Sequence, residues 1–505
     1  MKFNLKAKKG KQIVNHEGEK AFALTPAMEL YTAVATASLN DQFYEKSANK
    51  LICIRQLIAQ NDALFVAKLA IYTREQMHLR SIPLVLAVEL AKQHSGDNLI
   101  SKLTTRVIQR ADEIAELLAY YASANERKEV KQLNKLSKQL QKGLADAFNK
   151  FDEYQFAKYN MDAKVKLKDA LFLVHPKAKD GAQQILFDKI AKDELQVPYT
   201  WEVELSKLGQ QKFDSQELKL ATKKAKWEEL IFSNKLGYMA TMRNLRNILE
   251  AEVSKEALNK VSEYISNEKA VANSKQLPFR FLAAYRELKE LRNGRVSKLL
   301  DALEQAVLHS AANIAGYDED TKVVLAADVS GSMQQPVSAK SKVLLYDIGL
   351  MLAMLLQSRC NNVITGMFGD KWKVINVPKK NILANVQEFY RREGEVGYST
   401  NGYLVVKDLL ESKKAVDKVM LFTDAQLWNS TGSGEGIEGL WKQYKKMAPA
   451  AKLYLFDLAG HGNTPLSVMR DDMYLIAGWS DKIFGVLKAV EEGSDAIKMI
   501  EGIDL

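Results

Sequence analysis

Oxygen-bearing side chains follow a short apolar run near residue 328. Asp328, Ser330 and Ser332 alternate along the chain directly after the run 322–327. In a turn that leaves a strand, this spacing lets one carboxylate and two hydroxyl groups converge on one point, and Gly331 permits the tight path between the serines. Carboxylate and hydroxyl oxygens are the ligands that Mg²⁺ and Ca²⁺ prefer. The segment therefore predicts a divalent-cation site, with Mg²⁺ as the expected ion.

Two later segments could complete this site. Thr400 lies in the polar segment 399–402, and Asp424 follows Thr423 at the end of the apolar run 419–422. The carboxyl ends of parallel strands meet at one edge of a sheet, so these side chains are expected near Asp328. A simpler alternative is that the serines cap the next helix and Asp424 closes a turn. That alternative leaves two carboxylates at adjacent strand ends to repel each other, which a cation would relieve.

The last third of the chain has the pattern of an α/β domain. Short apolar segments are separated there by helix-like segments or turns, which predicts a mostly parallel sheet covered on both faces. The expected strands are 322–327, 363–368, 374–377, 419–422, 452–456 and 473–476, and a helix is expected over 341–360. The acidic segment 316–320 is interpreted as a linker. We place the domain boundary there, with a helical domain over 1–318 and an α/β domain over 319–505.

The chain from Thr25 to about Ala315 is patterned almost entirely as amphipathic helices. Thr25 followed by Pro26 is typical of a helix start. Breakers such as Ser95-Gly96-Asp97 and Leu277-Pro278 punctuate the helices at intervals that suit a stacked helical-repeat array, although no strict period is present. We expect a multidomain α plus α/β protein.

Composition excludes several classes of protein. Hydrophobic residues make up 47% and charged residues 27% of the 505 residues, which leaves no room for extensive disorder. The longest apolar stretch, 343–356, contains Asp347 and is shorter than the roughly 20 residues of a membrane span. No apolar segment follows the basic N-terminus, and Cys53 and Cys360 make no disulfide framework. We expect a cytoplasmic protein without a membrane partner.

Positive charge is concentrated in the helical part. Residues 1–300 contain 50 Lys and Arg against 36 Asp and Glu, whereas residues 301–505 contain 22 against 26. Five lysines recur at spacings of three and four, which places them on one helical face: Lys128, Lys131, Lys135, Lys138 and Lys142. Such a stripe suits phosphate contacts, and a merely solvated face is an equal alternative.

Both parts resemble known families. The order of D-x-S-x-S at 328–332, a loop with Thr400 and a strand ending in Thr-Asp at 423–424 resembles the metal-ion-dependent adhesion site of von Willebrand A domains. By that resemblance Asp328, Ser330, Ser332, Thr400 and Asp424 are metal ligands, either directly or through water. In the helical part, several segments resemble the TROVE module of the Ro autoantigen family of RNA-binding proteins. These are 14–18, 69–74, 79–83, 173–177, Trp227 with 239–245, and 277–280.

The Ro resemblance implies a HEAT-like ring of helical repeats closed by the A domain. It implies that a central hole accepts the single-stranded 3′ ends of misfolded RNA, and that a basic outer surface binds structured noncoding Y-like RNA in RNA quality control. A ribonuclease is a candidate protein partner, and DNA is not expected. Lys158 and His175 match positions of family RNA contacts, and Arg243 is a further candidate. Lys131 and Lys135 of the lysine stripe join them as candidate RNA-binding residues.

Each of these residues also has an ordinary structural alternative. Lys158 could be an ordinary surface lysine, His175 before Pro176 a turn residue, and Arg243 an ion-pair partner of Glu250.

Two other functions compete with RNA binding. The first is an adaptor that binds an acidic protein side chain through the metal of its A domain. The second is a metal-dependent nuclease that uses Asp328 and Asp424, with Asp370 and Asp457 also near predicted strand ends. Two-metal phosphoryl chemistry needs more acidic ligands and a base, and the sequence offers no convincing set. We therefore expect a protein that is not an enzyme.

Overall fold

The chain folds into two compact units. The computed structural model describes residues 12–15, 18, 20–37, 48–126, 136–160, 165–312, 314–337, 341–427, 436–465 and 472–505. Unit 1 contains Met1–Thr36 and Leu208–Ala496, and unit 2 contains Ala37–Lys207 and Ile497–Leu505. The chain therefore passes between the units three times. Across the described residues, no helix combines the length and the apolar character needed to span a bilayer.

Unit 2 is built from stacked helices. In chain order they are α3 (Ala48–Ala59), α4 (Ala63–Glu75), α5 (Ser81–Gln93), α6 (Leu99–Val107), α7 (Asp112–Ala124), α8 (Lys138–Phe148), α9 (Glu153–Tyr159), α10 (Leu167–Val174) and α11 (Gly181–Lys192). Helix α4 packs on α5 and α6, α5 on α7, and α6 on α8. The buried Arg74 guanidinium lies 2.7 Å from the Glu113 carboxylate and joins α4 to α7. Helices thus stack on their near neighbours in sequence, as in a repeat array.

Described segments near both ends of the chain pack against residues far away in the sequence. The C-terminal helix α25 (Ala496–Glu501) leads into unit 2, where the Lys68 ammonium of α4 donates to the Glu501 carbonyl at 2.5 Å. At the other end, α1 (Pro26–Ala35) lies in unit 1, where the Tyr31 hydroxyl donates to the Ala477 carbonyl at 3.0 Å. The predicted start of α1 is confirmed, because the Thr25 hydroxyl accepts from the Met28 N–H and Pro26 opens the first turn.

Unit 1 contains a second set of helices and the α/β domain. Helix α12 (Trp201–Gly209) spans the junction, and α13 (Gln216–Phe232), α14 (Tyr238–Arg243), α15 (Leu245–Glu250), α16 (Lys255–Ser266), α17 (Glu268–Ser274), α18 (Pro278–Lys289) and α19 (Val296–Ser310) follow. The Arg286 guanidinium of α18 binds both carboxylate oxygens of Asp347, at 2.7 and 2.5 Å, and the Asp347 side chain is fully buried. This ion pair fastens the helices to the α/β domain.

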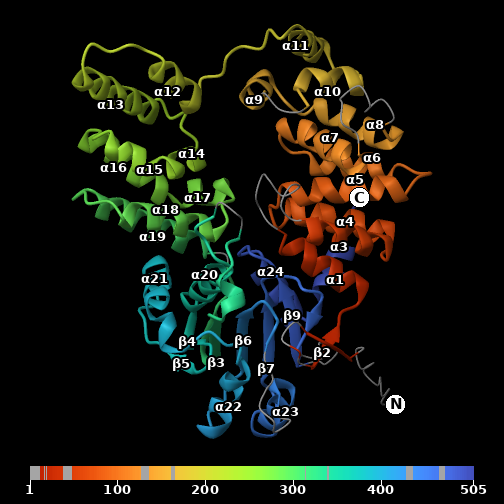
Figure 1. Cartoon of the computed structure of the whole chain (residues 1–505), viewed down its shortest axis with the longest axis vertical. Coiled ribbons are helices and arrows are strands. Elements are labelled where there is room, and N and C mark those ends of the chain that lie inside the picture. The colour runs from red at the N-terminus through yellow and green to blue at the C-terminus, as the bar shows by residue number, and fades with distance from the viewer. Residues whose placement is uncertain are drawn as a thin grey trace. The chain divides into compact units, whose positions relative to one another are not determined.

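The α/β domain has a six-stranded sheet in the order β5-β4-β3-β6-β7-β9. The strands are β3 (Tyr317–Asp328), β4 (Cys360–Phe368), β5 (Trp372–Val374), β6 (Lys418–Thr423), β7 (Lys452–Asp457) and β9 (Met473–Ala477). All neighbours are parallel except the antiparallel edge strand β5. The helices between them are α20 (Leu345–Gln357), α21 (Ile382–Arg392), α22 (Tyr403–Glu411) and α23 (Ile437–Met447), and α24 (Ile483–Glu491) follows the last strand (Figure 1).

Helices cover both faces of this sheet. On one face, Val324 and Leu421 share a buried core with residues of α22 and α23, such as Leu409 and Trp441. On the other face, α20 crosses β3, β4 and β6, with Gly349 against Phe422. The strands are therefore apolar on both sides, which is why they stand out in the sequence as continuous runs.

Three predicted elements have different bounds in the structure. The acidic segment 316–320 is not a linker, because β3 already begins at Tyr317 and pairs with Cys360, with a register shift before Lys322. The edge strand covers Trp372–Val374 rather than 374–377, and the helix predicted over 341–360 covers Leu345–Gln357. Exposed acidic side chains concealed the first part of β3.

An N-terminal hairpin belongs to unit 1. Strands β1 (Gln12–Val14) and β2 (Lys20–Ala23) pair antiparallel, and β2 pairs with β8 (Asn463–Thr464). Strand β2 and helix α1 thus pack with β8 and β9, whereas the sequence pattern predicts residues 1–318 as one helical domain. The boundary at 318/319 stays a prediction.

Candidate functional site

The predicted metal loop, residues 328–332, leaves β3 at the carboxyl edge of the sheet. Asp328 is 1% exposed, and one of its carboxylate oxygens accepts from the Ser330 N–H at 2.9 Å. Its other oxygen accepts from the Thr423 hydroxyl at 2.6 Å. The hydroxyls of Ser330 and Ser332 are 3.2 Å apart. One carboxylate and two hydroxyls therefore lie together, as the spacing predicts.

The other two predicted ligands lie at the same edge. Strands β3 and β6 pair with Ala327 opposite Phe422, so Asp424 emerges one residue beyond the level of Asp328. Asp424 is 1% exposed, and its carboxylate accepts from the Gln426 N–H at 3.1 Å. Thr400, which is buried, belongs to a loop that is fastened to the metal loop by the Gly331 N–H, which donates to the Tyr398 carbonyl at 2.9 Å.

The two buried carboxylates are not paired with a cationic side chain in the part of the chain that the structure describes. Burial raises the pKa of Asp328, and the neighbouring charge of Asp424 raises it further, although hydrogen bonds from Ser330 and Thr423 oppose this shift. Among the described residues, no Lys, Arg or His forms an ion pair with either carboxylate. Two acids and three hydroxyls at one buried edge are a donor set that fits a hard divalent cation.

The nearby acids have other tasks. Asp370 is exposed, and its carboxylate accepts from the Ser399 N–H at 3.0 Å, which orders the loop before Thr400. Hydrogen bonds from the Ser399 side chain and then from its N–H lower the pKa of Asp370. Asp457 accepts from the N–H groups of Ala459 and Gly460. In the described part of the chain, no three His, Cys, Asp or Glu residues group into a metal site. The centre thus depends on hydroxyls as much as on carboxylates.

Thr423 is a residue of this centre that the sequence pattern did not predict. Its hydroxyl donates to the Asp328 carboxylate and fixes the orientation of that carboxylate. The contact depends on the register between β3 and β6, which the sequence does not encode locally. The Thr-Asp pair at the end of an apolar run was the available signal.

Among the candidate RNA-binding residues, Lys158 lies in a cluster of aromatic rings. It is exposed on α9, and its ammonium lies 5.8 Å from the ring centroid of Tyr154 and 5.4 Å from that of Tyr159. The Arg110 guanidinium stacks over the Tyr159 ring at 4.4 Å. Tyr154 is 47% exposed. We call these four residues the Lys158 cluster.

His175 and Arg243 occupy helix ends. His175 is exposed with a left-handed backbone (φ 51°) and ends α10, where Gln141 of α8 donates to the carbonyls of Leu173 and Val174. Arg243 is the exposed last residue of α14. Glu250 is bound by Arg246 at 2.8 Å, and no ion pair with Arg243 is found within the described residues.

The lysine stripe lies only partly within the described residues. Lys131 and Lys135, together with Lys128, lie outside the described residues. Lys138 and Lys142 of the same stripe are exposed on α8. Lys158 and His175 belong to unit 2 and Arg243 to unit 1, so the candidates are distributed over both units.

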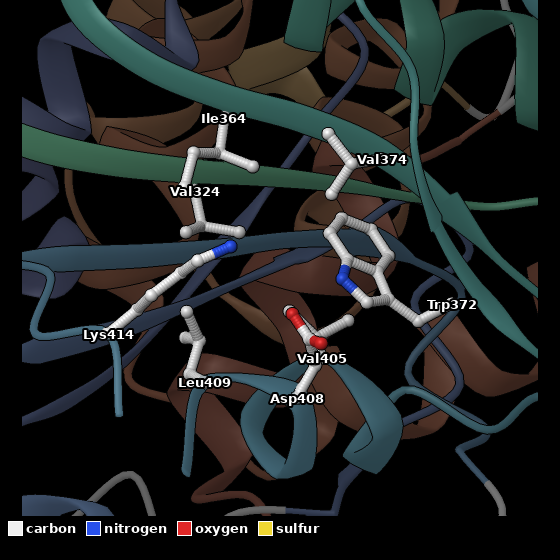
Figure 2. Close-up of a pocket in the computed structure, with 8 residues that line it drawn as sticks. All are labelled: Val324, Ile364, Trp372, Val374, Val405, Asp408, Leu409 and Lys414. Carbon is white, nitrogen blue, oxygen red and sulfur yellow. The ribbon is translucent and has the colours of Figure 1, made fainter. Parts of the chain in front are cut away.

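A small hollow in the α/β domain contains none of the predicted residues. Figure 2 shows it between strands β3, β4 and β5 and helix α22, with apolar side chains and with Asp408 and Lys414 as its polar groups. Its lining consists of Val324, Ile364, Trp372, Val374, Val405, Asp408, Leu409 and Lys414. It is distinct from the candidate metal centre.

Fold and site together define a class of protein: stacked helices joined to a von Willebrand A-type domain with a candidate cation site. The TROVE domain family matches residues 19–199 and 192–338, and the Ro60 vWA domain matches residues 322–490. The chain therefore belongs to the TROVE family, whose Ro members bind RNA and are generally noncatalytic. The predicted combination of helical repeats and an A domain is confirmed.

The chain is also similar to individual proteins. The chain is similar to the crystal structure of the Deinococcus radiodurans RO (RSR) protein, with a TM-score of 0.57 and 17% identity over 92% of this chain and 99% of that chain. It is also 24% identical over 305 residues to telomerase protein component 1 of Rattus norvegicus, and 26% identical over 300 residues to that of Mus musculus. These matches cover 45% and 46% of this chain but 11% of each relative, so the chain spans about a tenth of their length.

Proposed function

We propose that this protein is a noncatalytic RNA-binding protein of RNA quality control or processing. It holds structured, Y-like noncoding RNA on exposed basic residues, and it holds misfolded RNA by its single-stranded 3′ end. The observation that carries this proposal is the TROVE match over residues 19–338, because the Ro members of this family bind RNA.

The Lys158 cluster supports contact with a single strand. Unpaired bases stack on exposed aromatic rings, which contributes about 1–3 kcal/mol per base. Tyr154 offers such a ring, and Lys158 lies between Tyr154 and Tyr159 with no carboxylate paired to it in the described part of the chain. A lysine held over ring faces is available for a phosphate. The cluster thus combines one group for the base with one for the backbone.

Structured RNA requires a different kind of surface, since a duplex offers mainly phosphates and 2′-hydroxyls. Lys138 and Lys142 are exposed on α8, and His175 lies where Gln141 fastens α8 to α10. Not every lysine of this region is available. The Lys150 ammonium donates to the carbonyls of Thr105 and Ile108, so it stabilises the end of α6.

The candidate metal centre supports docking of a protein. A bound Mg²⁺ would supply the positive charge that an acidic side chain of a partner, such as a ribonuclease, requires. Asp328, Ser330, Ser332, Thr400 and Asp424 would hold the ion. Thr423 would keep the Asp328 carboxylate in place. This role places RNA binding and protein docking on different residues.

Filter binding tests the RNA proposal. A structured RNA with and without a single-stranded 3′ tail is titrated with the full chain over a salt series. We expect steep salt dependence and tighter binding of the tailed RNA. Lys158→Ala should reduce the affinity for the tailed RNA about fivefold, a loss of about 1 kcal/mol in binding free energy. Lys168→Ala is the matched control, because that ammonium is already paired with Asp193 at 2.6 Å.

Equal and negligible affinity for both RNAs would contradict the proposal. Retention of an acidic protein partner by the wild type but not by Asp328→Ala would then favour the metal-dependent adaptor. Mg²⁺-dependent cleavage of the RNA, lost in Asp424→Ala, would instead reveal a nuclease.

A further inference from the structure

The three residues after Asp424 form a buried turn with an unusual backbone. Ala425, Gln426 and Leu427 are 0%, 2% and 0% exposed. Ala425 has φ 62°, in the left-handed region, although it carries a Cβ atom. This conformation costs an L-residue roughly 1–2 kcal/mol and persists only where surrounding contacts hold it.

Two side-chain amides hold the 425–427 turn from outside. The buried Asn15 side chain donates to the Leu427 carbonyl at 3.0 Å. The Gln426 side chain donates to the side-chain oxygen of Asn463 at 3.1 Å, and both residues are buried. Each contact connects the turn to the small sheet of β1, β2 and β8.

The N-terminal hairpin makes the first contact directly and is joined to the second through β8. Asn15 directly follows β1, and Asn463 lies in β8, where it pairs with Ala23 of β2. Inside the turn, the Gln426 N–H donates to the Asp424 carboxylate at 3.1 Å. The hairpin is thus connected to a candidate metal ligand through two buried hydrogen bonds and one residue with a left-handed backbone.

We propose that the N-terminal hairpin positions the Asp424 carboxylate for the cation, with Asn15 as a positioning residue. The inference rests on the proposed metal site. When the hairpin is docked, Ala425 keeps its left-handed backbone conformation, and the Gln426 N–H keeps one Asp424 oxygen in place. When the contact from Asn15 is lost, Ala425 can relax, and the carboxylate loses its fixed orientation. Coupling of this kind is reciprocal, so the cation also stabilises the docked hairpin.

Cation binding to variants of the full chain tests this inference. Mn²⁺ affinity is measured by electron paramagnetic resonance on chelator-treated protein. Asn15→Ala and the more nearly isosteric Asn15→Leu should each weaken Mn²⁺ binding about five- to tenfold. Asn385→Ala is the matched control, because this buried amide in the same domain donates to the Pro378 carbonyl and not to the turn. It should leave Mn²⁺ affinity within twofold of the wild type.

A glycine at the strained position gives a sharper test. Glycine adopts a left-handed backbone at no steric cost, so Ala425→Gly should keep the turn without help from Asn15. In that background, Asn15→Ala should weaken Mn²⁺ binding less than twofold. If Asn15→Ala reduces Mn²⁺ affinity equally in both backgrounds, the left-handed backbone of Ala425 does not have this role.

Hydrogen exchange of the wild type tests the reverse direction without any substitution. Mg²⁺ should slow amide exchange in β2, at Phe22 and Ala23, when compared with chelator-treated protein. If the wild type binds no cation, the proposed metal site itself is wrong. If it binds Mn²⁺ normally while Asn15 variants bind equally well and β2 gains no protection, only the present inference is overturned.

Discussion

The candidate metal centre and the Lys158 cluster arrange charged groups in opposite ways. At the metal centre, Asp328 and Asp424 are both 1% exposed, and backbone N–H groups and a hydroxyl hold their carboxylates. In the Lys158 cluster, an exposed lysine rests on tyrosine rings. A small ion of fixed geometry requires ligands ordered in advance, whereas a flexible strand requires rings and charges that water can reach.

Substitutions at the two sites should have different effects. Changes at buried charges should alter stability or cation affinity steeply, because they leave a partner desolvated. Changes at exposed charges should alter RNA affinity in small, salt-dependent steps. The two kinds of effect should be separable in one protein.

The largest effect is expected at the buried ion pair of Arg286 and Asp347. Arg286→Ala leaves the Asp347 carboxylate buried without its partner, which should lower the free energy of unfolding by about 3–5 kcal/mol in urea titrations. Arg246→Ala is the control, since Arg246 and Glu250 are about half exposed. That exposed pair should cost under about 1 kcal/mol. Equal losses would break the distinction between buried and exposed charges.

The next effect concerns the two buried carboxylates. Asp328→Asn should weaken Mn²⁺ binding at least about 100-fold, or about 2.7 kcal/mol. In chelator, the same variant should be more stable than the wild type, because it removes one of two like charges. A variant that loses both cation affinity and stability in chelator would contradict this account of the site.

The sign of the pH dependence follows from the raised pKa of Asp328. Its folded pKa lies above the unfolded value of about 4, so ionisation disfavours the folded protein. In chelator, the melting temperature of the wild type should therefore fall as pH rises from 5.5 to 8, and Mg²⁺ should restore it at pH 8. The Asp328→Asn variant should show a smaller fall over the same range. Identical pH profiles would show that Asp328 does not carry the effect.

A smaller effect is expected at the exposed ring of Tyr154. Tyr154→Ala should weaken binding of tailed RNA about five- to tenfold through loss of one stacked base, whereas Tyr154→Phe should stay within twofold. Binding of the untailed RNA should be unchanged in both variants. If Phe and Ala behave alike, the ring does not stack on a base.

The smallest effect is expected at the lysines of α8. Lys138→Ala and Lys142→Ala should each weaken structured RNA about two- to threefold, or about 0.5 kcal/mol, and lower the salt slope by about one ion. Their melting temperatures should match that of the wild type, because both side chains are exposed. A loss of affinity without a change in slope would argue against phosphate contacts.

The sequence predicted local features better than distant ones. The pattern Asp328, Ser330, Ser332 could be recognised because a strand end and a turn fix its geometry locally. The role of Asn15 could not be predicted, since its partner Leu427 lies 412 residues away. The contact of Arg110 with the Lys158 cluster could not be predicted either. Tyr154, in contrast, lies four residues before Lys158 on one helix, and this spacing predicts that the two side chains are neighbours.

Errors at element bounds have a physical cause as well. The acidic residues 318–320 favour a linker by composition, but in the structure they are the exposed part of β3, whose pairing with β4 is irregular there. A strand appears as a continuous apolar run only where both of its faces are buried. Only the inner half of β3 satisfies that condition.

The chain ends have a consequence for synthesis. The Tyr31 hydroxyl donates to a carbonyl 446 residues further along the chain, and β2 pairs with β8, which is synthesised much later. At translation rates of about 5–20 residues per second, this interval is on the order of a minute. During that time the first helix and its preceding hairpin leave the ribosome without their final partners. The nascent chain therefore carries an open strand edge that a chaperone, or a neighbouring nascent chain, can reach before the protein itself does.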